Sequence, residues 1–272
     1  MPELPEVETI RRDLLPHLPG RRVETVRVLR ASVLECSPRR LRAALTGAVI
    51  RDVRRHGKVL ILDLDSSLSL LVHLRMTGQL LLGAGVADPR FLRVVLQLSG
   101  GLRLLYADCR ALGRLELCGS SDLACSRALG RFGPDALDEE GLAALLAAAR
   151  RRRTPIKCLL LDQSVLAGIG NIYASEILHV ARTAPDRPAD ALTRAELNRL
   201  RRATRNVLSA AIEARGTTFS DFRTGTGEPG RYGAQLRVYG REGERCLRRG
   251  CRGTIVRLVQ QQRSTFFCPD CV

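Results

Sequence analysis

The sequence has no long uninterrupted apolar stretch and no excess of acidic residues. No apolar run of membrane-spanning length is free of charge, and acidic residues stand at the N-terminus where a secretory signal would be basic. These absences predict a cytosolic protein without a membrane span. The nine cysteines are an odd number, which favours reduced thiols over a disulfide framework.

Charge of one sign dominates the composition. The 272 residues include 44 Lys+Arg against 28 Asp+Glu, a net charge of +16, and the excess is nearly all arginine. Such a balance favours polyanions, and nucleic acid first. A hydrophobic content of 45% is ordinary for a globular protein, and the length suits one large or two medium domains.

Four cysteines near the C-terminus are paired in sequence as C-x4-C and C-x2-C. Two close pairs of thiolates suit a closed tetrahedral zinc site, and two disulfides or unbound thiols are the alternative. The residues between the pairs predict two strands, 254–259 and 264–267, joined by a polar hairpin that ends in Arg263. Arg263 could enter a nucleic-acid groove from that tip. The predicted zinc ligands are Cys246, Cys251, Cys268 and Cys271.

Short apolar runs separated by turns fill the first half of the chain and predict an antiparallel sandwich. Apolar spacing predicts a helix over about residues 4–15, before these runs, and a short helix is expected over 37–45, between the strands. After Gly133-Pro134 the period becomes helical up to Arg215, and a glycine-rich polar loop, 216–243, follows. The expected strands are 23–30, 48–54, 59–64, 69–74, 92–98 and 102–106.

The first residues allow two interpretations. Removal of Met1 would leave Pro2 with a secondary amine of pKa roughly 8, able to attack a sugar carbon, with Glu3 as proton donor or acceptor. Proline and acidic residues are equally typical of a first helical turn. Taken alone, the segment favours the helix start.

Residues 162–170 form a glycine-containing turn before a helix that begins at Asn171. Free amides at a helix start bind phosphate, and Arg152 and Lys157 add positive charge nearby. A plain helical hairpin with a glycine cap explains the turn equally well. Lys58, before the strand 59–64, is by itself no more than a surface lysine.

Taken together, these segments resemble the formamidopyrimidine-DNA glycosylase family, whose bacterial members excise oxidised purines. The resemblance covers the whole chain. Its markers are residues 2–8, 56–58, 73–78, 160–174, 238–241 and the four cysteines. It implies an α+β fold: an N-terminal antiparallel β-sandwich with the first helix (1–132), a helix-two-turns-helix domain (133–222), a mobile lesion-covering loop (223–243) and a zinc ribbon (244–272). Duplex DNA with oxidised bases or abasic sites would lie between the two domains.

The resemblance also implies roles. Pro2 would attack C1′ and release the base, Glu3 would open the sugar, Lys58 would assist β-elimination and Arg263 δ-elimination. One zinc ion would be structural. Met76, Arg110 and Leu112 would fill the space left by the flipped base. His73, Arg152, Lys157 and Asn171 would bind DNA, and Thr217, Thr218, Phe219 and Tyr232 belong to the segment that resembles the base-covering loop.

Three positions depart from the family pattern. Leu112 replaces a phenylalanine wedge, which predicts weaker stacking. Phe91 replaces a histidine and removes a DNA contact, and four residues instead of two separate Cys246 from Cys251.

Two other functions remain open: an endonuclease VIII-type enzyme for oxidised pyrimidines, and a non-catalytic damaged-DNA-binding protein on the same scaffold. The loop 216–241 favours the purine branch, and the joint presence of Pro2, Glu3 and Lys58 favours an enzyme. A cytoplasmic, nucleoid-associated bacterial monomer is expected.

Overall fold

The structure is a computed structural model that describes residues 2–83 and 88–272. The chain forms two compact units, residues 1–131 with 214–233 and residues 132–213 with 234–272. We call them the sandwich unit and the helical unit. The segment 214–233, which follows the last helix in sequence, therefore belongs to the sandwich unit.

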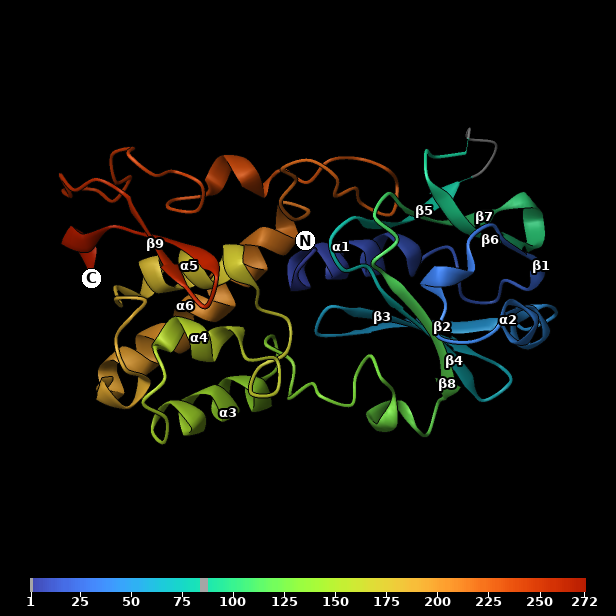
Figure 1. Cartoon of the computed structure of the whole chain (residues 1–272), viewed down its shortest axis with the longest axis horizontal. Coiled ribbons are helices and arrows are strands. Elements are labelled where there is room, and N and C mark those ends of the chain that lie inside the picture. The colour runs from blue at the N-terminus through green and yellow to red at the C-terminus, as the bar shows by residue number, and fades with distance from the viewer. Residues whose placement is uncertain (1, 84–87) are drawn as a thin grey trace. The chain divides into compact units, whose positions relative to one another are not determined.

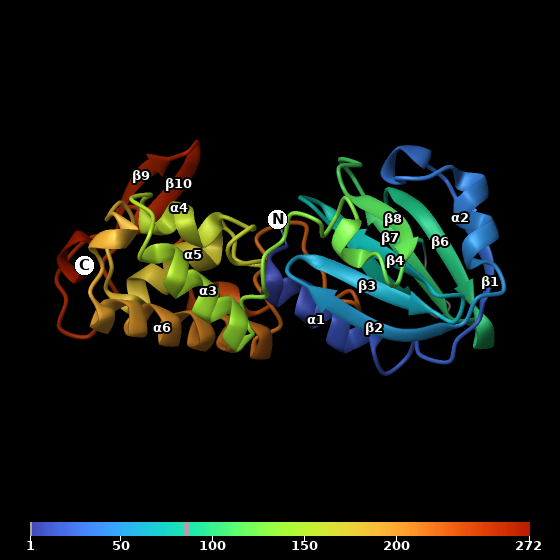
Figure 2. The same ribbon diagram turned by 90° about the horizontal axis from the view of Figure 1, so that it is seen from below.

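Two four-stranded antiparallel sheets build the sandwich unit, as the sequence predicts (Figures 1 and 2). Two of their strands, β5 (Gly78–Gly83) and β8 (Arg114–Gly119), lie outside the six predicted segments. The first sheet has the order β1 (Val23–Val28), β6 (Leu92–Leu98), β7 (Arg103–Asp108) and β5 (Gly78–Gly83). The second has the order β2 (Ile50–His56), β3 (Val59–Leu64), β4 (Leu68–His73) and β8 (Arg114–Gly119).

Helix α1 (Leu4–Leu14) contributes to the core of this unit and contacts β2 and β3. Its apolar positions fall on one face because they recur every three or four residues. Val7, Ile10 and Leu14 are fully buried in one cluster with residues of both sheets. Burying each such side chain contributes about 1.5–3 kcal/mol, which fixes the start of the chain on the sandwich. Helix α2 (Pro38–Leu45) begins at Ser37, whose hydroxyl accepts the Arg40 N–H.

The helical unit contains α3 (Glu139–Ala149), α4 (Ile156–Leu161), α5 (Asn171–Ala181) and α6 (Arg194–Glu213). Helix α5 is buried along most of its length and packs against α6 and against the C-terminal hairpin. Short 3-10 turns, η1 to η6, complete the described structure: Ala31–Val33, Ser99–Gly101, Leu123–Cys125, Ala189–Ala191, Tyr232–Gln235 and Pro269–Cys271. No helix in the described ranges is both long and apolar enough to span a bilayer.

The hairpin pairs β9 (Val256–Gln260) with β10 (Arg263–Phe267). Its turn is shorter than the sequence predicts, because Gln260 and Arg263 already pair with each other. Gln261 and Gln262 both have positive φ, 45° and 61°, which is the geometry of a tight two-residue turn that matches strand twist. Arg263 is exposed beside this turn.

Candidate active site and nucleic-acid interface

The first residues of the chain do begin a helix. Glu3 is the N-cap of α1, with φ −104° and ψ −171°, and its backbone N–H donates to Glu6 Oε2 at 2.8 Å. Pro2 is buried, and Glu3 and Glu6 are 2% and 1% exposed. The carboxylate of Glu6 therefore fixes the backbone of the residue that follows Pro2.

The other oxygen of Glu6 holds a segment from far along the chain. The Thr217 N–H donates to Glu6 Oε1 at 2.7 Å. Gly216 beside it has φ +79°, and a Cβ there would lie 2.9 Å from the same oxygen, so only glycine fits. One buried carboxylate thus joins the start of α1 to the segment 214–233.

Further hydrogen bonds order this segment. Asp13 of α1 accepts the Gly225 N–H at 2.9 Å and pairs with Arg215. The Thr218 hydroxyl donates to Phe222 O and accepts the Gly230 N–H. Of the other predicted loop residues, Tyr232 is buried and its N–H donates to Gly216 O, whereas Phe219 is 60% exposed.

Lys58 lies in the turn between β2 and β3 and is 6% exposed. The next residue, Val59, pairs with His73 of β4. Burial, aided by the positive charges of Arg75 and Lys58, lowers the pKa of His73 to about 3. His73 is therefore neutral near pH 7, and its Nδ1 accepts the Arg75 N–H at 3.1 Å.

The three predicted wedge residues come from two loops tied to one carboxylate, that of Asp108. Asp108 is 1% exposed; its Oδ1 accepts the Thr77 hydroxyl at 2.5 Å and the Arg110 N–H at 3.2 Å. Thr77 follows Met76, so the link joins the β4–β5 turn to the β7–β8 loop. Met76 and Leu112 are 42% and 40% exposed, so each loop carries one apolar side chain that is accessible from solvent.

Close packing at Gly113 completes this loop. The Gly113 N–H donates to Asp108 Oδ2 at 2.8 Å, and the Tyr106 hydroxyl donates to the same oxygen at 3.2 Å. A Cβ at Gly113 would lie 1.9 Å from the Tyr106 hydroxyl oxygen. The position therefore excludes every other residue type unless the loop moves.

Phe91, where the family pattern has histidine, is 43% exposed and has φ 63°. The guanidinium carbons of Arg90 and Arg93 lie 4.8 Å and 5.8 Å from its ring centre. The aromatic ring is thus held by cation–π contacts and cannot replace the hydrogen-bonding capacity of an imidazole.

In the helical unit, Lys157 is a buried connector. It is fully buried, and its Nζ donates to Asn171 Oδ1 at 2.7 Å, Thr265 Oγ1 at 2.7 Å and Ser264 O at 3.1 Å. The Asn171 amide also donates to Ser264 O at 2.9 Å. Both side chains therefore hold the hairpin strand β10 against the start of α5.

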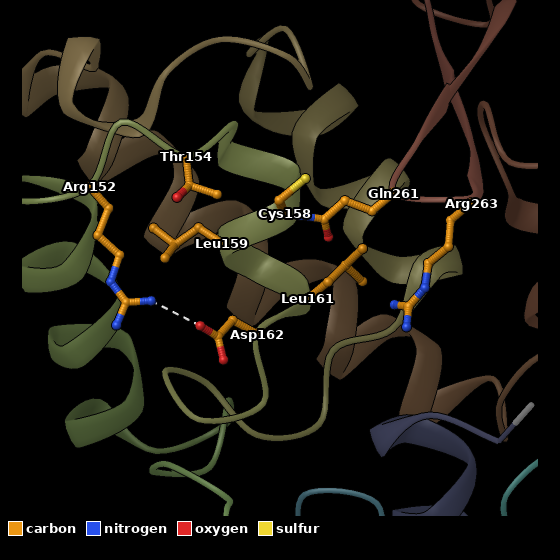
Figure 3. Close-up of a pocket in the computed structure, with 8 residues that line it drawn as sticks. All are labelled: Arg152, Thr154, Cys158, Leu159, Leu161, Asp162, Gln261 and Arg263. Atoms are coloured by element: carbon orange, nitrogen blue, oxygen red, sulfur yellow. Dashed lines mark hydrogen bonds and ion pairs between the residues drawn. The ribbon is translucent and has the colours of Figure 1, made fainter.

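Arg152 and Arg263 line one cavity of about 300 Å³ in this unit (Figure 3). Arg152 Nη1 pairs with Asp162 Oδ2 at 2.9 Å, and the guanidinium of Arg263 faces the cavity from the hairpin side. Two arginines from segments far apart in sequence thus meet at a basic hollow that suits phosphate oxygens. The rest of its lining is Thr154, Cys158, Leu159, Leu161 and Gln261.

The turn between α4 and α5 is held by Gln163. Its side-chain amide donates to Leu161 O at 3.0 Å and Ile169 O at 2.8 Å, and its Oε1 accepts the Gly168 N–H at 3.0 Å. Gly168 has φ +114°, a conformation that other residues rarely adopt. These contacts leave Asn171 at the first position of α5, as the phosphate-site prediction requires.

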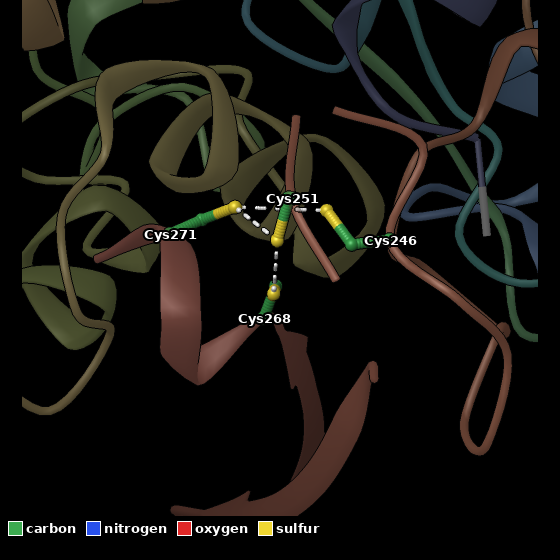
Figure 4. A group of neighbouring side chains, drawn as sticks. All are labelled: Cys246, Cys251, Cys268 and Cys271. Atoms are coloured by element: carbon green, nitrogen blue, oxygen red, sulfur yellow. Dashed lines mark hydrogen bonds between the residues drawn. The ribbon is translucent and has the colours of Figure 1, made fainter. Parts of the chain in front are cut away.

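The four predicted zinc ligands converge (Figure 4). Their sulfurs all lie within 4.8 Å of one another, with separations of 3.6 Å between Cys246 and Cys271 and between Cys251 and Cys268. Four sulfurs about 2.3 Å from a tetrahedral zinc ion lie about 3.8 Å apart, so the set fits the metal. The N–H groups of Arg248 and Gly253 donate to Cys246 and Cys251 sulfurs. The longer C-x4-C spacing therefore still closes a four-cysteine zinc finger.

Sequence reasoning missed three residues that build these sites: Glu6, Asp108 and Glu176. Glu176 on α5 is 1% exposed and accepts three backbone N–H groups, of Arg237, Val238 and Tyr239, each at 2.9 Å. An acidic residue inside the apolar run of α5 was the available signal. The link from Asp108 to the β4–β5 turn could not be read from the residues around Asp108, because Thr77 is 31 residues away in sequence.

Family models match three consecutive parts of the chain: the formamidopyrimidine-DNA glycosylase N-terminal domain over residues 1–115, its H2TH domain over 132–223, and the zinc finger found in FPG and IleRS over 243–272. The formamidopyrimidine-DNA glycosylase of Cereibacter sphaeroides is 43% identical over 281 residues, with 100% of this chain and 99% of that protein covered. That of Pelotomaculum thermopropionicum is also 43% identical, over 275 residues and with the same coverage.

Solved structures show the same family relationship as the sequence comparisons. Lactococcus lactis Fpg in complex with DNA containing an abasic site has a TM-score of 0.90 at 29% identity, covering 99% of this chain and 98% of that one. The same enzyme with DNA containing Fapy-dG has a TM-score of 0.89 at 29% identity, with 99% of each chain covered. The sandwich with its N-terminal helix, the two-turn helical unit and the four-cysteine finger are thus found in the same order in these relatives. The chain belongs to the formamidopyrimidine-DNA glycosylase family.

Proposed function

We propose that this protein is a bifunctional DNA glycosylase and AP lyase that excises oxidised purines, such as 8-oxoguanine and formamidopyrimidines, from duplex DNA in base excision repair. The observation that carries the proposal is the Glu6 carboxylate, which binds both the Glu3 N–H and the Thr217 N–H. It ties the residue next to the nucleophilic amine to the segment that resembles the base-covering loop.

The chemistry follows from the residue types. With Met1 removed, the lone pair of the Pro2 amine forms a bond to C1′, and the C1′–base bond breaks with its electron pair going to the base. The base leaves protonated, and the amine loses its own proton. Glu3 donates a proton to the ring oxygen, so the sugar opens and the nitrogen is left as an iminium. Loss of a C2′ proton then expels the 3′ phosphate, and a second elimination expels the 5′ phosphate.

Two cations would serve the eliminations. Lys58 lies close enough to His73 for its positive charge to lower the pKa of that imidazole, and it would assist β-elimination and contact a phosphate. Arg263, exposed beside the hairpin turn, would bind phosphate with Arg152 and assist the second elimination. Asn171 belongs to the same phosphate-binding set, and Lys157 supports it by holding Asn171 and β10.

Recognition of the damaged base requires its extrusion from the duplex. Met76 and Leu112 would fill the vacated space, and Arg110 would hydrogen-bond the orphaned cytosine. Thr217, Thr218, Phe219 and Tyr232 would cover the extruded base, and His73 would contact the backbone. The zinc ion would stabilise the finger that carries Arg263 and would hold it in place for the phosphate.

Borohydride trapping tests the proposal against its alternatives. The purified protein is incubated with duplexes containing 8-oxoguanine opposite cytosine or a dihydropyrimidine, reduced, and digested to map the adduct. We expect an adduct at Pro2, mainly with 8-oxoguanine. An adduct confined to the dihydropyrimidine would move the protein to the endonuclease VIII-type function, and specific binding without any adduct would leave a damaged-DNA-binding protein.

A matched variant that carries one extra residue before Pro2 keeps the fold and blocks the amine, so it should bind the duplex without trapping. Mass spectrometry of the intact protein establishes whether Met1 is removed. We further propose that the protein acts as a monomer on the bacterial nucleoid in the cytoplasm. Sedimentation with and without duplex tests the monomer.

A further inference from the structure

A second cavity in the helical unit has no role in the proposed chemistry. It measures about 450 Å³ and lies at the knuckle formed by Cys246 to Cys251. We call it the arginine pocket. Its lining is Arg182, Arg248, Arg249, Gly250, Cys251, Arg252, Asp270 and Cys271.

The end of α5 and the knuckle build this pocket together. Arg182 terminates α5 in a left-handed conformation, and its N–H donates to His179 O. The guanidinium of Arg248 donates to the same carbonyl oxygen. Within the knuckle the Cys251 N–H donates to Arg248 O at 3.0 Å, and Gly250 has φ +81°. The longer C-x4-C spacing therefore places Arg248 and Arg249 beside Arg182.

None of the four arginines of the pocket forms an ion pair within the described ranges, 2–83 and 88–272. Arg182, Arg249 and Arg252 are exposed, and their side chains make no hydrogen bond or ion pair there. Asp270 lines the same cavity without pairing to any of these three described arginines. Nε of Arg248 is buried and has no acceptor in the described part of the chain. Some surface arginines elsewhere in the helical unit, such as Arg187 and Arg205, do pair with carboxylates.

The negative charge of the zinc-bound thiolates would offset only part of the positive charge of the arginines. Four thiolates on one divalent ion carry a net charge of −2, and four arginines line the pocket, so positive charge remains even after Asp270 is included. A planar guanidinium binds phosphate oxygens through two parallel hydrogen bonds. Four arginines line the cavity, so their guanidinium groups together can offer donors to more than one phosphate group.

We propose that the arginine pocket binds two adjacent phosphate groups, as in pyrophosphate or in the backbone of a nucleic acid. The site is distinct from the Arg152–Arg263 hollow, because the two cavities share no lining residue. It does not depend on glycosylase activity. Its test therefore needs no damaged base.

Titration calorimetry of pyrophosphate into the full-length zinc-loaded protein tests the site. Wild type should bind with saturable one-site behaviour, and Arg182→Gln and the double variant Arg249→Gln/Arg252→Gln should each bind at least about tenfold more weakly, the effect of removing roughly one charge-assisted hydrogen bond. The control is Arg194→Gln/Arg202→Gln, which removes two exposed arginines of α6 in the same unit and should change affinity less than about twofold. Non-saturable binding, or an equal weakening in the control, would overturn the proposal.

Zinc content is measured in every variant. It distinguishes arginines that bind phosphate from arginines that only neutralise the negative charge of the zinc-bound thiolates. Arg182 lies at the end of α5, outside the finger, so its variant should keep zinc and lose pyrophosphate. If Arg182→Gln binds pyrophosphate normally while Arg249→Gln/Arg252→Gln loses zinc, the arginines serve only the metal and the proposal fails.

Undamaged duplex identifies the source of the phosphates. The steepness of log affinity against log salt decreases by about 0.9 for each DNA phosphate that the protein no longer neutralises. A shallower slope in Arg249→Gln/Arg252→Gln, unchanged in the α6 control, assigns the pocket to a nucleic-acid backbone. An unchanged slope together with abolished pyrophosphate binding assigns it to a free phosphate ligand.

Discussion

Thr217 and Glu6 are 211 positions apart in sequence and are joined by a 2.7 Å hydrogen bond from the Thr217 N–H to the Glu6 carboxylate. The second oxygen of Glu6 accepts the N–H of Glu3, the N-cap of α1. A displacement of the 214–233 segment would therefore also move the start of this helix. The position of the 214–233 segment, proposed to cover the base, and that of the residue after Pro2 therefore depend on one buried side chain.

Glu6→Gln replaces one of these two acceptors by an amide donor. One buried N–H then loses its partner, at a cost of about 1–3 kcal/mol, and we expect a lower melting temperature with excision of 8-oxoguanine reduced on the order of tenfold. Unfolding scans and single-turnover excision measure the two effects. Excision at the wild-type rate in a destabilised variant would show that the carboxylate serves the fold alone.

Gly113→Ala should disrupt the wedge loop. The added methyl would lie 1.9 Å from the Tyr106 hydroxyl oxygen, and overpacking of this kind costs about 1–3 kcal/mol. We expect reduced stability and weaker binding of a duplex with an abasic-site analogue. Gly233→Ala is the matched control, because a Cβ there would meet its nearest neighbour only at 3.9 Å.

Leu112→Phe should tighten binding of lesion-containing duplex. Leu112 is 40% exposed, so a larger ring fits without repacking, and stacking of an aromatic ring on a base exceeds that of an aliphatic side chain. We expect a gain on the order of 1 kcal/mol, about fivefold in Kd, with undamaged duplex changed less. Leu112→Ala should shift binding the opposite way, and equal effects of both variants would contradict a wedge at this position.

Stability should fall on mild acidification partly because of His73. Its pKa is about 3 in the folded protein against about 6.5 when unfolded, so only the unfolded chain takes up the proton between these values. The contribution of His73 to the free energy of unfolding is fully present above pH 6.5. It decreases by up to about 1.4 kcal/mol per pH unit as the pH falls below that value. Urea unfolding at about pH 7 and about pH 5 measures the loss.

His73→Gln removes this proton while keeping an acceptor for the Arg75 N–H. The free energy of unfolding of this variant should change less steeply with pH than that of the wild type, because the contribution of His73 is missing. His179, whose pKa burial and then Arg248 lower to about 4, should still titrate in this variant and gives the remaining slope. An unchanged slope would mean that His73 is accessible to protons in the folded state.

Removal of zinc should unfold the finger. Its small buried cluster consists of Val238 and Ile255 with two of the cysteines, Cys246 and Cys268, so the metal supplies most of its cohesion. Cys268→Ala should lower zinc stoichiometry and weaken DNA binding because Arg263 loses its support. The exposed Cys125 provides the control, and Cys125→Ala should leave both unchanged.

The sequence predicts most elements here because their signals are local. Apolar spacing locates α1, and the cysteine spacing locates the finger. Strand β5 was missed because it is bounded by glycines, and β8 because its first residue, Arg114, closely follows a loop. The roles of Asp108, Gly113 and Glu6 could not be predicted, since each depends on partners brought together only by the fold.

The domain boundaries, too, could be predicted only where the signal is local in sequence. A change from strand to helix period marks the junction near residue 132. The return of 214–233 to the sandwich unit has no compositional signal, because it depends on single contacts such as Asp13 with Gly225. Glycine-rich polar sequence predicts a loop, and it cannot tell which unit the loop joins.

Lys58 and Lys157 are the only lysines in this sequence, and both are buried. Arginine supplies all other positive charge of the side chains near neutral pH, so reagents that acylate amines have almost no exposed target on the folded protein. A limiting amount of such a reagent would label whichever α-amino group begins the mature chain. The scarcity of lysine thus gives a chemical route to a single-site probe, and in the mature chain proposed here the labelled amine is that of Pro2 itself.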